Sequence, residues 1–198
     1  MTQSRSSLRE RRRWQTARDL HHATLDLVRQ HGFAAVTTEM IAAEAGISLR
    51  TFFNYYPNKE SALVGPPPRM DETALGEFSA GTGPLIADFS RLVLAEIRAK
   101  AVNKAVIRTI DTVIAAMPEI ELAFIKSLSQ LTAQLAQALA QRADVPPGPA
   151  ADLLAEVLTH ALGRTFRGWG HDDGMTPEQA VQAMAGDLTA IVRALNGR

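Results

Sequence analysis

The chain has 198 residues, a formal net charge of zero and no cysteine. Its length suits one large domain or a small module fused to a larger one, and the lack of cysteine excludes disulfide bonds and thiolate metal sites. No uninterrupted apolar stretch approaches the roughly 20 residues that span a bilayer, so we expect neither export nor membrane insertion and place the protein in the cytoplasm.

Charge is unevenly distributed along the chain. Residues 1–64 carry nine Lys and Arg against six Asp and Glu, whereas residues 65–198 carry twelve against fifteen. Much of the positive excess lies near the N-terminus, in Arg5, Arg9, Arg11, Arg12 and Arg13. Such a segment can neutralise phosphates, although an arginine-rich terminus is more often a solvated tail. We expect residues 1–14 to form a basic flexible arm.

Helical periodicity dominates the chain, and no segment alternates apolar and polar residues in the manner of a β-strand, which predicts an all-α protein. The first strong helix is expected at about residues 16–31, ending at Gly32. Two short helices should follow, at about 37–45 and 49–56, on either side of the turn residue Gly46. Hydroxyls of Thr37 and Thr38 are expected to cap the first of them and Ser48 the second.

A further helix is expected to begin at Asn58 and to stop at the run Gly65–Pro68, because proline lacks an amide donor and its ring clashes with the preceding turn. We place a domain boundary there, between residues 15–65 and residues 66–198. In the second domain, apolar stripes predict five longer helices, at about 85–97, 106–117, 120–139, 150–169 and 178–195.

The two short helices around Gly46 have too little surface to be stable alone, so they must pack on the preceding helix. This pattern, at about residues 37–56, is typical of a helix-turn-helix, whose second helix enters the major groove of DNA. Three side chains are expected to pack inward: Ile47, Phe52 and Tyr56. Four are expected to face base edges: Leu49, Arg50, Thr51 and Asn54. Tyr55 and Lys59 suit phosphates better, because Lys59 lies in the first turn of the next helix.

The segment Gly32–Leu63, which contains the sequence TTEMIAAEAGISLRTFFNYYPNK at residues 37–59, closely resembles the N-terminal signature of the TetR family of bacterial regulators. The resemblance implies a three-helix helix-turn-helix head followed by a larger helical ligand-binding and dimerisation body. It also implies DNA contacts from Thr37, Thr38, Ser48, Leu49, Arg50, Thr51, Phe53, Asn54, Tyr55 and Lys59. The chain departs from the family in Phe53, where a tyrosine is usual, and in Pro66–Pro68, where one continuous helix is usual.

The same resemblance implies a homodimer that forms through the last two long helices, about 150–169 and 178–195. Both are apolar over a wide arc, although ordinary core helices of a monomer would look alike. Two heads about 34 Å apart would match a pseudo-palindromic operator in double-stranded DNA.

By analogy with the family, a small, largely apolar effector would bind among the stripes between residues 85 and 139. The candidate lining residues are Phe89, Arg108, Asp111, Ile114, Met117, Phe124, Leu128 and His160. The apolar ones are as readily explained as plain core. His160, with Glu156 and Arg164 four residues to either side, is as readily explained as part of a solvated ladder.

No pattern in the sequence indicates an enzyme, a metal site or a cofactor. His21 and His22 are adjacent on a helix and point in different directions, which is poor ligand geometry, and there is no P-loop, dinucleotide-binding fingerprint or nucleophile elbow. The hypothesis is a repressor that leaves its operator when the effector binds. The alternative is a DNA-binding regulator or architectural protein without small-molecule control, and ligand-dependent loss of operator binding would separate the two.

Overall fold

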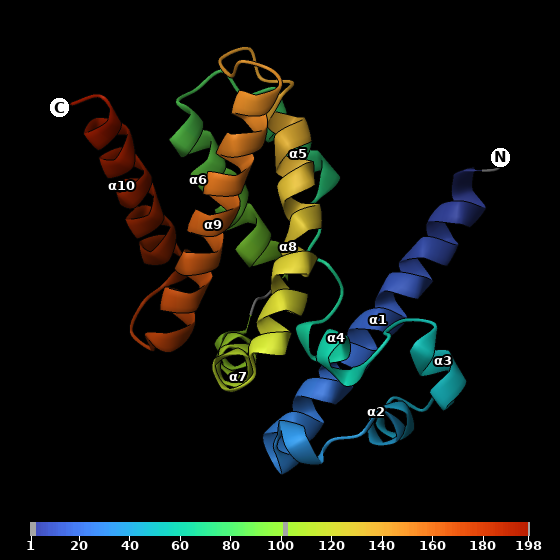
Figure 1. The fold of residues 1–198 in the computed structure, drawn as a ribbon. Coiled ribbons are helices and arrows are strands. Elements are labelled where there is room, and N and C mark those ends of the chain that lie inside the picture. Colours follow the sequence, from blue (N-terminus) through green and yellow to red (C-terminus); the bar gives the residue numbers. More distant parts are fainter. Residues whose placement is uncertain (1–2, 101–102, 198) are drawn as a thin grey trace. The chain divides into compact units, whose positions relative to one another are not determined.

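A computed structural model describes residues 3–100 and 103–197, and the regular elements within them are all helices (Figure 1). The predicted all-α class is confirmed. In the described part of the chain, no helix is long and apolar enough to cross a membrane. The chain divides into two compact units. One comprises the residues up to Pro67 together with Thr109–Ser127, and the other comprises Pro68–Arg108 and the residues from Leu128 onward.

Helix α1 (Gln3–His31) is much longer than expected. The prediction of a flexible arm over residues 1–14 is wrong from Gln3 onward, and residues 1–2 lie outside the described residues. The physical reason is that no glycine or proline precedes Gly32, while Arg, Leu, Glu and Gln favour a helix even without an apolar stripe. At its C-terminus the helix ends as predicted, because Gly32 adopts a φ of 76° that only glycine adopts easily.

Four short elements follow α1 in the same unit: η1 (Phe33–Ala35), α2 (Thr38–Glu44), α3 (Leu49–Phe53) and α4 (Lys59–Val64). Each α-helix begins at the expected cap, where the side chain of Thr37, Ser48 or Asn58 accepts a hydrogen bond from a backbone N–H of the first turn. The core of the unit is formed by fully buried side chains, among them Leu20, Leu25, Ile41, Phe52 and Leu63. The short helices are therefore held by packing on α1, as expected.

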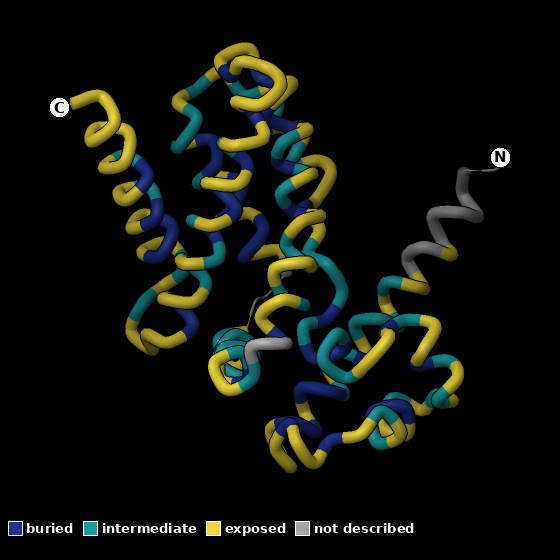
Figure 2. Tube along the Cα trace, in the orientation of Figure 1, coloured by how far each residue is buried: buried dark blue, intermediate teal, exposed yellow. Residues whose placement is uncertain are grey.

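The other unit contains longer helices. These are α5 (Glu72–Ser79), α6 (Leu85–Lys100), α9 (Pro149–His171) and α10 (Pro177–Leu195), together with the first part of α7 (Lys104–Ala116) and the second half of α8 (Pro118–Leu139). Helix α10 packs against α6 and α9. Figure 2 shows buried positions along α6 and on one side of α9 and α10. Helix α5, which the sequence did not predict, begins after Asp71, whose carboxylate accepts hydrogen bonds from the Thr73 and Ala74 amides.

A buried arginine ties several loops of this unit together. The Arg142 guanidinium donates from Nη1 to the carbonyl of Phe78 (2.8 Å) and to Asp88 Oδ2 (2.9 Å), and from Nη2 to the carbonyl of Gly83 (3.0 Å). Its Nε and Nη2 also donate to the two carboxylate oxygens of Asp144, at 2.8 and 3.0 Å. The arginine thus engages all five of its donors. The same contact lowers the pKa of the Asp144 carboxyl.

Helix α7 is anchored by contacts within each unit. In its first two turns, Lys104 Nζ donates to the carbonyls of Asp172 (2.6 Å) and Met175 (2.8 Å), and Arg108 forms hydrogen bonds with the Gly170 carbonyl and with Asp173. These partners lie in the last turn of α9 and in the connection from α9 to α10. The next residue, Thr109, accepts a hydrogen bond from Arg29 Nε of α1 at 3.2 Å.

Candidate nucleic-acid interface

Helix α3 is the helix predicted to read DNA bases, and a tight turn connects it to α2. Gly46 separates α2 from α3 with a φ of 66°, a conformation that other residues rarely adopt. The Ile47 N–H then donates to the Ala42 carbonyl at 2.9 Å, which holds the turn closed. Ser48 caps α3 through the Thr51 N–H at 3.0 Å. The start of α3 is therefore fixed relative to α2.

The side chains of α3 divide largely as the periodicity predicts. Phe52 and, beyond the helix, Tyr56 are buried, whereas Arg50 and Asn54 are exposed. Leu49 and Thr51, which were also expected to face bases, are half-buried, as is Ile47. The helix is shorter than expected, because it ends at Phe53 rather than near Tyr56.

Five of the expected DNA contacts have side chains that are hydrogen-bonded within the protein: Thr37, Thr38, Ser48, Thr51 and Lys59. The hydroxyl of Thr37 caps α2, and that of Ser48 caps α3 and also lies 2.8 Å from the Thr51 hydroxyl. The Lys59 ammonium donates to the carbonyls of Phe33 (3.0 Å) and Val36 (2.8 Å) and lies over the Phe33 ring. These groups therefore stabilise the head, and their contacts with phosphate stay predictions.

The N-terminus of α2 already holds a negative charge. Hydrogen bonds from its own backbone N–H and from the Thr37 and Thr38 side chains lower the pKa of the Glu39 carboxyl, with the backbone contact the largest cause. The exposed carboxylate is therefore ionised at neutral pH. Because it occupies the positive end of a short helix, this helix end is a poorer phosphate site than the one the sequence suggested.

Two aromatic side chains near the end of α3 have different environments. Phe53 is 50% exposed, and its ring meets that of Phe52 edge to face with centroids 5.3 Å apart. Tyr55 is half-buried, and the Arg13 guanidinium lies 5.8 Å from the centre of its ring. The sequence predicted a flexible arm that included Arg13, so the position of Arg13 beside α3 was missed. The signal that could have revealed it is the uninterrupted helix propensity before residue 16.

Hydrogen bonds of Tyr56 and His21 connect α1 to the segment after α3 and to α4. The Tyr56 hydroxyl donates to the Ala17 carbonyl at 2.9 Å, and burial raises its pKa. His21 Nδ1 lies 3.0 Å from the Ala62 carbonyl, and since a carbonyl can only accept, this nitrogen carries the proton. Gly65 must be glycine, because a Cβ there would lie 2.8 Å from the His21 ring and its φ is 86°.

Burial lowers the pKa of His21 from 6.5 to about 4, and the nearby positive charges of His22 and Arg18 act in the same direction. The neutral ring therefore contributes stability that is fully present above pH 6.5 and lost as the pH falls towards 4. At about 1.4 kcal/mol per pKa unit, the loss should approach about 3 kcal/mol. The variant His21→Asn, which cannot titrate, should show a flatter dependence of unfolding free energy on pH over this interval.

The exposed neighbour His22 provides the matched control for this prediction. The variant His22→Asn should keep the wild-type pH profile in chemical denaturation followed by circular dichroism. Identical profiles for both variants and the wild type would show that His21 titrates normally in the folded protein.

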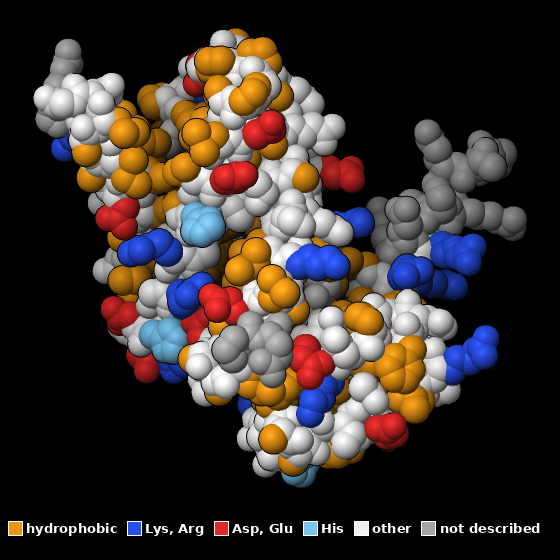
Figure 3. Space-filling view, in the orientation of Figure 1, with side chains coloured by type: hydrophobic (Ala, Val, Ile, Leu, Met, Phe, Trp, Pro, Cys, Tyr) orange, Lys and Arg blue, Asp and Glu red, His pale blue; other side chains and the backbone are white. Residues whose placement is uncertain are grey.

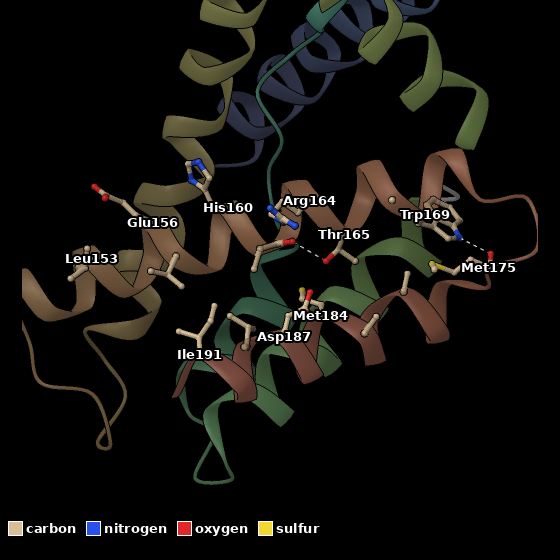
Figure 4. Close-up of a pocket in the computed structure, with 16 residues that line it drawn as sticks. Leu153, Glu156, His160, Arg164, Thr165, Trp169, Met175, Met184, Asp187 and Ile191 are labelled. Carbon is tan, nitrogen blue, oxygen red and sulfur yellow. Dashed lines mark hydrogen bonds between the residues drawn. The ribbon is translucent and has the colours of Figure 1, made fainter. Parts of the chain in front are cut away.

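A groove of about 490 Å³ lies between α9 and α10 (Figure 4). Its walls are mainly apolar, with Leu153, Val157, Met184 and Ile191 among the lining residues. Polar side chains enter it as well, and they are Glu156, His160, Arg164, Thr165 and Asp187. Figure 3 shows hydrophobic side chains gathered over these two helices. Several of them are strongly exposed, including Leu153, Ile191, Val192 and Leu195.

Of the residues predicted to bind an effector, His160 lines this groove and the other seven do not. Phe89 is fully buried in the core, against Phe78. Arg108 is hydrogen-bonded to Gly170 in α9 and to Asp173 beyond it, and Leu128 packs against the core. The remaining four, Asp111, Ile114, Met117 and Phe124, belong to the other compact unit and are partly exposed.

Among residues 3–100 and 103–197, no three His, Asp or Glu side chains are grouped closely enough to hold a metal ion.

Comparison with known proteins supports the sequence resemblance. Residues 20–63 match the family model for bacterial regulatory proteins of the tetR family. A search of curated proteins found no similar sequence.

Solved structures share the fold over nearly the whole chain. One, from Mesorhizobium loti and described as a TetR-family transcriptional regulator, is 15% identical, with 91% of this chain and 98% of that chain covered and a TM-score of 0.53. NalD, described as the secondary repressor of the MexAB-OprM multidrug efflux pump in Pseudomonas aeruginosa, is 15% identical, with coverage of 89% and 96% and a TM-score of 0.55. Salmonella enterica GusR is 14% identical, with coverage of 91% and 94% and a TM-score of 0.52. Residues 20–63 are therefore similar to the DNA-binding head of the tetR family of bacterial regulatory proteins, and the chain shares its overall fold with solved TetR-family structures.

Proposed function

We propose that this regulator is a repressor that binds a pseudo-palindromic operator in double-stranded DNA and leaves it when a small, largely apolar ligand binds. The observation that carries the DNA-binding part is the exposure of Arg50 on a short helix fixed by Gly46 and Ser48, and of Asn54 at the C-terminal end of that helix. A guanidinium can bond guanine O6 and N7 together, and an asparagine amide can do the same with adenine. The repressor role has a precedent in NalD, which shares the fold.

The residues around Arg50 and Asn54 have supporting roles in this proposal. The Thr51 hydroxyl lies against Ser48, so its methyl group is the part that suits a thymine, and Leu49 adds apolar contact. Backbone phosphates are assigned to Thr37, Thr38, Tyr55 and Lys59, as the family resemblance implies. Phe53 offers only its ring, because it has no hydroxyl to donate to a phosphate.

We propose further that two copies associate through α9 and α10. The apolar groove between these helices and the exposed side chains beside it, such as Leu153 and Ile191, would lose contact with water in a dimer. An isologous pairing repeats the same contacts twice and places two heads for a two-fold symmetric site. His160, Glu156 and Arg164 line the groove, so in this arrangement they are interface residues rather than effector contacts.

The experiment that tests the function is a footprint of the full-length protein on the DNA that flanks its own coding region. The expected result is a symmetric protected site with two half-sites about one helical turn apart. Addition of small apolar compounds should abolish protection if the protein is a ligand-released repressor. Protection that no compound changes would favour the alternative, a DNA-binding or architectural protein without small-molecule control. A monomeric mass in solution at the concentration that gives protection would contradict the dimer.

A further inference from the structure

The N-terminal half of α1 presents a row of arginines. Arg9, Arg12 and Arg13 are exposed, and their spacing of three and four residues places them on one face of the helix. Figure 3 shows Lys and Arg side chains gathered at this part of the molecule. The row is part of a helix that continues without a break into the buried core around Leu20 and Leu25. Its orientation is therefore set by the fold.

Arg13 shows where this face lies. Its Nη2 donates to the Asn54 carbonyl at 3.4 Å, and its guanidinium lies 5.8 Å from the centre of the Tyr55 ring. Both partners are at the C-terminal end of α3, the proposed reading helix. Arg9 lies about one helical turn from Arg13, towards the N-terminus of α1. The row thus begins beside the reading helix and runs away from its end.

The positive charge of the row is not balanced by ion pairs within the described residues. Arg9 and Arg13, four residues apart, repel one another on the helix surface, and such like-charge pairs destabilise a helix. A row of negative groups along this face would remove the repulsion. Guanidinium groups bind phosphate oxygens well, through paired and charge-assisted hydrogen bonds.

We propose that Arg9, Arg12 and Arg13 contact the DNA backbone beside the half-site that α3 reads. This interface rests on the proposed function, because it needs α3 to lie in the major groove. The contacts bind phosphates and so strengthen binding to every sequence without adding base preference. Each head thereby covers a longer stretch of DNA than the helix-turn-helix alone.

The test compares two variants of the full-length protein that lose the same charge. In R9Q/R12Q the two arginines without a described partner are removed, and Arg13, which touches α3, is kept. In the control R91Q/R98Q two exposed arginines of α6 are removed. Glutamine suits a helix nearly as well as arginine, so both variants should fold.

Binding to the footprinted operator is measured by fluorescence anisotropy at several salt concentrations. Each lost phosphate contact should flatten the slope of log K against log salt by about 0.9, which gives about 4 for two heads. At about 0.1 M salt, R9Q/R12Q should bind roughly 10- to 1000-fold more weakly than the control. In ethylation interference, R9Q/R12Q should differ from the control only at phosphates outside the half-sites, where ethylation should no longer weaken its binding.

Equal slopes and equal interference patterns for the two variants would overturn this interface, while the proposed function would stand as long as the wild type binds its operator. A wild-type protein that binds no site in the flanking DNA would refute the proposed function and this interface with it. The two failures are thus told apart by the wild-type footprint.

Discussion

Replacing Arg142 by methionine is expected to lower the free energy of unfolding by about 3–5 kcal/mol. The Arg142 side chain is 0% exposed and its partner Asp88 is 3% exposed, so the substitution leaves a buried carboxylate with only the exposed Arg91 as its cation. It also removes the donors to the Phe78 and Gly83 carbonyls, which hold the chain before α6. The measurement is urea denaturation, where the midpoint should fall while the slope stays unchanged.

The control for this prediction is Asp144→Asn. Its carboxylate accepts from the same guanidinium but is 46% exposed, so water can replace the lost ion pair and the expected cost is about 1 kcal/mol or less. Similar losses for the two variants would show that the arginine acts as an ordinary surface partner. The contrast isolates the cost of burial.

Removal of the Arg50 guanidinium should relax the choice of base at one operator position per half-site. The variant Arg50→Ala is expected to lose about 1–3 kcal/mol of discrimination at that base pair, and Asn54→Ala a similar amount at another. Neither side chain is buried, so the head should stay folded. The measurement is affinity for a panel of operators that each carry one changed base pair.

Lys59→Ala serves as the comparison in the same panel. It should weaken binding to all operators alike and reduce the salt slope, since a phosphate contact carries no base preference. Because Lys59 also donates to the Phe33 and Val36 carbonyls, the unfolding midpoint of the Lys59→Ala variant must be measured together with its DNA affinity. Sequence-blind losses from all three variants would contradict the assignment of base readout to Arg50 and Asn54.

The parts of the head that local sequence determines were predicted well. A capping hydroxyl or amide acts within three residues of itself, so Thr37, Ser48 and Asn58 could be assigned from the sequence, and the structure has all three caps. A glycine that ends a helix is equally local, as Gly32 shows. These signals do not depend on the rest of the chain.

Contacts between distant residues could not be predicted in this way. Arg142 lies 54 residues from Asp88, and no periodicity relates them. The carbonyls that hold Lys59 are those of Phe33 in η1 and of Val36 directly after it, and the position of η1 depends on how α1 ends. The N-terminal half of α1 was missed for another reason, because a helix without an apolar stripe gives no periodic signal even where its residues favour it.

The segment Gly65–Pro68 affects how a dimer would choose among operators. Its three prolines have φ fixed near −65° and no amide hydrogen to donate. A segment of this kind has few backbone conformations to sample. Once one head is bound, the effective concentration of the second at the other half-site depends on that freedom. A segment with little freedom makes this concentration high at one half-site separation and low at others. The protein should therefore bind weakly to operators with an inserted or deleted base pair between the half-sites.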